Sequence, residues 1–69
     1  MLAQVKPENG KYLVQAYRAE SITGHMSWQT IAETDDQGLA IRLREYCRYE
    51  GHDSEIDTMR DFYLATHNK

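Results

Sequence analysis

The sequence predicts a small α+β domain in which an antiparallel sheet packs on one helix. Residues 11–19 (KYLVQAYRA) and 26–33 (MSWQTIAE) are rich in the β-branched and aromatic residues that favour strands. Residues 32–51 contain a start signal, an apolar stripe and a stop signal for a helix. A chain of 69 residues buries only about 60% of the surface that its unfolded form exposes, so little core remains for an enclosed active site.

The first half of the chain is expected to form a hairpin. Residues 1–10 contain Pro7 and the turn pair Asn9-Gly10, and we expect them to form a flexible tail that leads into the first strand. Segment 20–25 (ESITGH) has the polar character of a hairpin connection. Within the first strand Tyr12 and Tyr17 fall on opposite faces, so one tyrosine ring should lie on the sheet face away from the helix.

The predicted helix is well delimited. Thr34 is the expected N-cap, and its hydroxyl should accept the backbone N–H of Gln37. Asp35 and Asp36 then occupy the first turn, where the helix dipole favours negative charge. Gly51 suits the position just past the C-terminus, which often needs a left-handed backbone. At 100° per residue, one apolar stripe faces the sheet; its members are Leu39, Ala40, Leu43, Tyr46 and Cys47.

Residues 54–65 (SEIDTMRDFYLA) fit two secondary structures. Ile56, Met59 and Tyr63 form a helical stripe, whereas the alternate residues from Ile56 to Leu64 form one face of a strand. Because a hairpin and one helix bury little apolar surface, a third strand beside the hairpin is the favoured interpretation. The predicted fold is therefore ββαβ in a single domain, and ββαα is the alternative.

The charge distribution favours a protein partner. The formal net charge is −3, and the segment from Glu33 to Asp61 contains nine acidic residues and four arginines. Nucleic acids bind clustered Lys and Arg, so this half of the chain suits a basic protein surface better than bare phosphate. The single cysteine and the lack of a long apolar run predict a cytoplasmic protein without an internal disulfide or a membrane span.

No motif predicts catalysis, a metal or a cofactor. Cys47 and His52 straddle a helix end and do not match the short ligand spacings of zinc sites. The acidic residues of the last segment fit a solvated face better than a pair of catalytic carboxylates, and the glycines are isolated. We therefore expect a non-enzymatic protein that uses no cofactor.

Two surfaces are candidates for partner binding. On the helix, Ile41 lies about 160° from Leu43, beside Glu45, Arg48 and Tyr49, which resembles an apolar interface centre with a polar rim. On the sheet, exposed aromatic and arginine side chains would supply the residue types that dominate binding energy. The complete set of candidate partner-binding residues is Tyr17, Arg18, Trp28, Ile41, Glu45, Arg48, Tyr49, Asp57, Arg60, Asp61 and Tyr63.

About half of the chain carries a resemblance to a known group of proteins. The matching residues lie around the helix and in the last segment; they are Ala32, Glu33, Thr34, Asp36, Leu39, Tyr46, Ile56, Met59, Arg60 and Phe62. They resemble a small phage-encoded inhibitor of bacterial RNA polymerase, built of a hairpin, a helix and a third strand. The pattern's second arginine position holds Thr58 in this chain. The small α+β style is also similar to that of anti-CRISPR proteins.

The resemblance implies an inhibitor without enzymatic activity that binds a positively charged region of a host enzyme, with Arg60 as the matched arginine. We therefore expect a phage or mobile-element protein that inhibits or modulates a host nucleic-acid-handling complex. One alternative is an RNA- or single-stranded-DNA-binding module, because an aromatic sheet face can stack bases. A second alternative is a homodimer that pairs through the face of Ile41 and Tyr49 or through a sheet edge.

Overall fold

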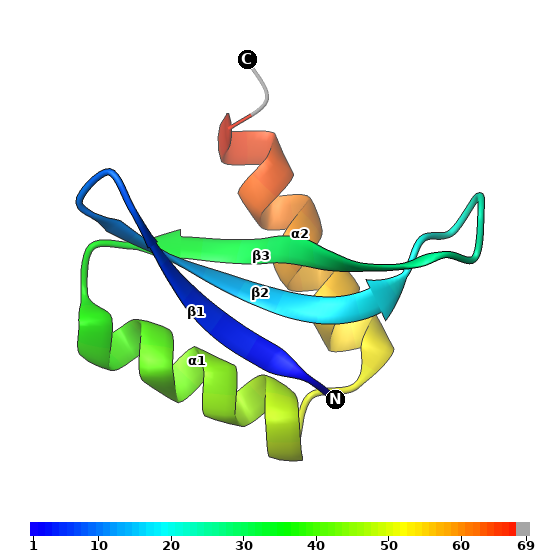
Figure 1. Cartoon of the computed structure of the whole chain (residues 1–69), viewed down its shortest axis with the longest axis horizontal. Helices are drawn as coiled ribbons and strands as arrows, with labels where there is room; N and C mark the ends of the chain where they lie inside the picture. Colours follow the sequence, from blue (N-terminus) through cyan, green and yellow to red (C-terminus); the bar gives the residue numbers. More distant parts are fainter. Residues whose placement is uncertain (68–69) are drawn as a thin grey trace.

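Three antiparallel strands precede two helices in the chain (Figure 1). The computed structural model describes residues 1–67. The sheet has the order β1-β2-β3, and it confirms the predicted α+β class. The elements are β1 (Ala3–Glu8), β2 (Lys11–Ala19), β3 (Met26–Thr34), α1 (Gln37–Tyr49) and α2 (Asp53–His67).

Strand β1 replaces most of the predicted N-terminal tail, so that prediction is wrong for residues 3–8. Asn9 (φ 51°) and Gly10 (φ 78°) form a tight two-residue turn between Glu8 and Lys11. Both residues have positive φ, as the turn that matches strand twist requires, and Asn-Gly is the pair that adopts it most readily. Pro7 is compatible with this strand because β1 lies at the sheet edge, where a missing N–H breaks no pairing.

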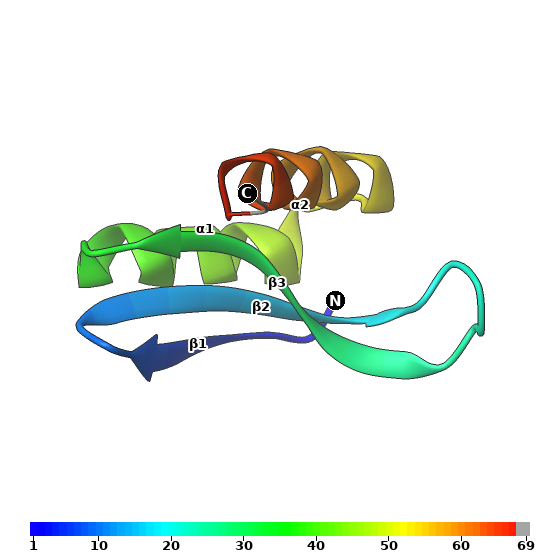
Figure 2. The same ribbon diagram turned by 90° about the horizontal axis from the view of Figure 1, so that it is seen from above.

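The predicted hairpin of β2 and β3 is confirmed, and a bulge adjusts its register. Val14 pairs with Ala32 whereas Gln15 pairs with Thr30, which leaves Ile31 as the extra residue on β3. As a result the consecutive residues Ile31 and Ala32 both contact the core. The loop between the two strands projects beyond both helices (Figures 1 and 2).

Helix α1 begins two residues later than the capping argument predicts. Asp36, not Thr34, is the N-cap, and its side chain accepts the N–H of Leu39 at 3.2 Å. Thr34 still ends β3 and its hydroxyl accepts the N–H of Asp36 at 3.1 Å. At the other end the prediction of a left-handed Gly51 is wrong, because positive φ among the glycines is confined to the two in the hairpin turns.

Close packing favours glycine at position 51 instead. A Cβ on this residue would lie 3.0 Å from the Cα of Cys47 and 3.1 Å from the Cδ1 of Ile56. The N–H of Gly51 donates to the carbonyl of Tyr46 at 2.7 Å. The absence of a side chain therefore lets the chain leave α1 and enter α2 within a few residues.

The last segment forms helix α2, so the favoured third strand at 54–65 is wrong and the helical alternative is confirmed. The helical stripe of Ile56, Met59 and Tyr63 is the pattern that the structure uses: Ile56 is buried and Met59 packs against the core. The sheet gains its third strand from β1, which removes the physical need for a strand after α1.

Both helices lie on the same side of the sheet (Figure 2). The core joins one face of all three strands to α1 and α2; its buried apolar residues are Ala3, Val14, Ala16, Ile31, Ala40, Cys47 and Ile56. Most of the predicted α1 stripe contributes, because Ala40 and Cys47 are buried and Leu43 and Tyr46 pack beside them. Leu39, at the start of the stripe, is exposed. Within residues 1–67, the opposite face of the sheet carries no helix (Figure 2).

We expect Ile56→Ala to lower the free energy of unfolding by about 2–5 kcal/mol, because it leaves a cavity where α2 meets the core. Urea denaturation followed by circular dichroism measures the change. Leu64→Ala is the matched control on α2: Leu64 is 41% exposed, and we expect a change within about 0.5 kcal/mol. Equal losses in the two variants would contradict the packing of α2 through Ile56.

Candidate functional site

The uncovered sheet face carries an exposed apolar surface, which we call the sheet patch and define as Leu2, Tyr17, Trp28 and Met26. Tyr17 pairs with Trp28 across β2 and β3, and their ring centroids are 5.2 Å apart in a tilted arrangement. The N–H of Tyr17 donates to the carbonyl of Leu2 at 2.9 Å, which extends the same row. Trp28 is 42% exposed, Met26 51% and Leu2 66%.

A row of hydrogen-bonded side chains crosses all three strands next to the sheet patch. The Nε2 of Gln4 donates to the Oε1 of Gln15 at 2.8 Å, and the Nε2 of Gln15 donates to the Oγ1 of Thr30 at 3.1 Å. The three side chains hydrogen-bond to one another on the sheet surface, so these bonds do not depend on a binding partner. The row gives the sheet patch a polar boundary on one side.

The other boundary of the sheet patch is acidic. A depression at this edge is lined by residues of β2 and β3 and by the first turns of α2, including Asp53 and Asp57. Arg18 lies on the opposite strand face from Tyr17, where its guanidinium contacts the Asp57 carboxylate at 2.6 Å and the Asp53 carboxylate at 3.8 Å. Arg18 and Asp57 thus join β2 to α2 and do not lie on the sheet patch.

On the outer side of α1, the structure separates the four predicted residues into two groups. Arg48 donates from Nε and Nη2 to the carbonyl of Ala3, at 3.1 and 2.9 Å, and contacts Glu45 at 3.2 Å. These two residues therefore hold β1 to α1. Ile41 (38% exposed) and Tyr49 (78% exposed) remain on the surface as predicted.

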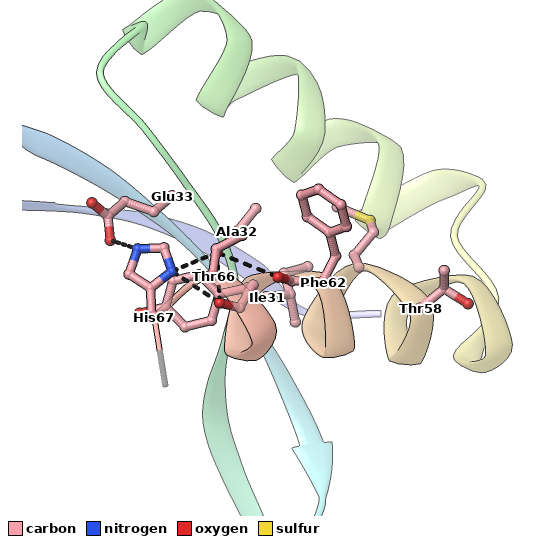
Figure 3. A pocket seen from close by; sticks show the side chains of 9 residues that line it. Ile31, Ala32, Glu33, Thr58, Phe62, Thr66 and His67 are labelled. Atoms are coloured by element: carbon pink, nitrogen blue, oxygen red, sulfur yellow. Dashed lines mark hydrogen bonds and ion pairs between the residues drawn. The ribbon is translucent and has the colours of Figure 1, made fainter. Parts of the chain in front are cut away.

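A groove of about 390 Å³ runs between β3 and the second half of α2 (Figure 3). Ile31 and Ala32 of β3 form one wall, and Met59, Phe62 and Tyr63 of α2 supply apolar surface opposite them. At one end the Nε2 of His67 lies 2.8 Å from a carboxylate oxygen of Glu33, and Thr58 and Thr66 add hydroxyl groups. We call this feature the β3/α2 groove.

The predicted residues of the last segment do not form one surface. Arg60 and Tyr63 are half-buried on α2, with Tyr63 lining the β3/α2 groove, and Asp61 is exposed. They were expected beside Tyr17 because a strand was assumed there. Sequence reasoning missed Leu2, Met26 and Phe62 as surface residues; the strand alternation through β1 and β3 would have identified the first two once β1 was recognised.

No group of three or more His, Cys, Asp and Glu side chains within residues 1–67 is arranged to hold a metal ion. Burial raises the pKa of the Cys47 thiol, and its sulfur lies in the core between α1 and the sheet. A buried thiol with a raised pKa is a poor nucleophile, since the thiolate is the reactive form. Cys47 therefore packs as a small apolar residue.

We expect Cys47 to react slowly with a disulfide reagent in the native protein and quickly after unfolding in urea. Because the folded state disfavours the thiolate, the unfolded state loses its thiol proton first as pH rises, and stability should fall above the usual thiol pKa range. Absorbance of the released thiol anion measures the rate, and urea melts at two alkaline pH values measure the stability. Immediate native labelling would contradict the burial.

Within residues 1–67, neither helix is long and apolar enough to cross a membrane. Comparison of the chain with protein-family models, with curated proteins and with solved structures found no match.

Proposed function

We propose that this protein is a non-enzymatic binding domain whose sheet patch docks on another protein. By its resemblance to small phage-encoded proteins, the partner is a host nucleic-acid-handling complex, such as RNA polymerase or a CRISPR effector, which the protein inhibits or modulates. The observation that carries the proposal is the pair of exposed Trp28 and half-buried Tyr17 on a sheet face that no helix of residues 1–67 covers.

The composition of the sheet patch supports a protein partner. Aromatic residues and methionine are enriched at the centres of protein interfaces, and Trp and Tyr give the largest losses when truncated. In the free protein Leu2, Met26 and Trp28 expose a third or more of their surface, although folding alone gains nothing from that exposure. A partner that covers them would recover the hydrophobic free energy that the fold leaves unused.

The charge at the border of the sheet patch favours a basic target. Asp53 keeps 82% of its side chain exposed and Asp57 keeps 59%, although Arg18 contacts both. A partner that places Lys or Arg side chains opposite these carboxylates would be steered toward the patch. This agrees with the acidic balance of the chain as a whole, whose net charge is −3.

The proposal predicts that Trp28→Ala loses its partner. Affinity purification from bacterial lysate should recover a stoichiometric partner protein with the wild type. The amount of partner recovered should fall at least about tenfold with Trp28→Ala, as is usual for a central aromatic residue. Trp28 is the only tryptophan, so its emission should shift to shorter wavelength when the purified partner is added. Expression of the protein should reduce the activity of that partner in the cell.

Ile41→Glu is the matched control, because it changes an exposed residue of α1 on another surface. We expect this variant to recover the partner as the wild type does. Loss of the partner with Ile41→Glu and its retention with Trp28→Ala would move the interface to α1 and overturn the role of the sheet patch. Absence of any stoichiometric partner would overturn the proposal itself.

A second candidate function is binding of single-stranded nucleic acid on the same sheet face. It is favoured by one observation: Lys6 is exposed on β1 and alternates onto the face of Gln4, beyond the glutamine row from Tyr17 and Trp28. Stacking on two rings with few cations predicts weak, salt-sensitive binding. Gel shifts with oligo(U) and oligo(dT) at low salt test it, and no shift at tens of micromolar protein removes it.

A further inference from the structure

We propose that the β3/α2 groove is a second binding site, which takes a basic segment of a protein partner that carries one large apolar side chain. The groove lies between β3 and α2, and α2 is on the helical side of the sheet (Figure 2). The sheet patch belongs to the opposite face by strand alternation. The groove is therefore independent of the function proposed above. The shape of the groove, its exposed apolar wall and the charges at its ends all fit such a segment.

Helix α2 exposes apolar surface at the groove that does not contribute to its packing on the core. Ile56 is its only buried residue among those described, and it attaches the first half of the helix to the core. In the second half Phe62 is 73% exposed although it lines the groove (Figure 3). Exposing an aromatic ring to water is unfavourable, and an apolar group that covered the ring would remove this cost.

The groove has the capacity for one large side chain. Its volume of about 390 Å³ lies at the lower end of the range of known ligand pockets, about 300–1,000 Å³. Ile31, Ala32 and Met59 offer apolar contact to an inserted side chain, while Thr58 and Thr66 lie along the rim. A leucine or phenylalanine from a partner would fill the space and cover the ring of Phe62.

Carboxylates at the two ends of the groove select for positive charge beside that apolar side chain. Glu33 lies at the His67 end. Glu55 precedes Phe62 by seven residues, which places it on the same line of the helix about 10 Å away. Glu55 is exposed, and among residues 1–67 it takes part in no ion pair. Lysines flanking the inserted side chain would meet these groups.

The test uses a synthetic nine-residue peptide with a central leucine and two lysines on each side of it. Titration into the ¹⁵N-labelled protein should shift the amide signals of Ile31, Ala32 and residues 58–67, with saturable binding. The same peptide with a central alanine should bind at least about tenfold more weakly, because the groove would stay unfilled. A peptide with glutamates in place of the lysines should produce no shift.

Two variants locate the site. Phe62→Glu should abolish the shifts, and Leu64→Glu should leave them unchanged, because Leu64 lies about 160° around α2 from Phe62 and does not line the groove. Circular dichroism confirms that both variants fold, and Thr66→Trp, which fills the rim from an exposed position, gives a second loss-of-binding variant.

Three results would overturn the proposal: no shift at millimolar peptide, equal binding of the alanine-centred peptide, or shifts that map to Tyr17 and Trp28. The first two leave the partner test for the sheet patch unaffected, and the third would place the peptide on the sheet patch instead of the groove. Conversely, a sheet patch without a partner leaves the peptide titration unchanged. The two proposals therefore fail separately.

Discussion

The structure depends on a core that one face of a three-stranded sheet shares with two helices. Three of its seven buried apolar residues are alanines: Ala3, Ala16 and Ala40. Small side chains at these positions let the helix backbone approach the strands closely, which suits a chain with few residues to bury. The larger members, Val14, Ile31 and Ile56, fill the space between the layers. Both helices are used on this face, so the other face of the sheet stays open.

Two arginines at the border of the core link the sheet to the two helices. Arg48 of α1 donates twice to the carbonyl of Ala3 at the start of β1, and Arg18 of β2 contacts the Asp57 carboxylate of α2. Sequence reasoning assigned both arginines to partner binding because Arg is common in interfaces. In this small domain the long arginine side chains instead bind neighbouring elements of the same chain. Their planar guanidinium groups hold elements that apolar packing alone would hold weakly.

The hairpin of β2 and β3 and the inward face of α1 could be predicted because they follow from local patterns. Alternation separates Tyr12 from Tyr17, and the helical period brings Ala40 and Cys47 to one side. The two wrong strand assignments have one cause. Reading residues 1–10 as a tail left the sheet one strand short, and the last segment was then assigned to that strand. The turn pair Asn9-Gly10 contained the missing signal, and Pro7 hid it because proline is excluded from central strands but not from an edge.

The candidate surfaces could be predicted only in part, because each needs contacts between residues that are distant in the chain. Tyr17 and Trp28 were identified from their residue type, but Leu2 joins them only through the pairing of β1 with β2. The β3/α2 groove needs the docking of α2 on β3, which no local pattern specifies. Strand alternation explains why the two faces of the sheet carry different kinds of side chain. Tyr17 and Arg18 are neighbours in the chain, yet one faces the open sheet and the other faces the acidic start of α2. This alternation places the aromatic pair on the uncovered face and the guanidinium on the face that carries the helices.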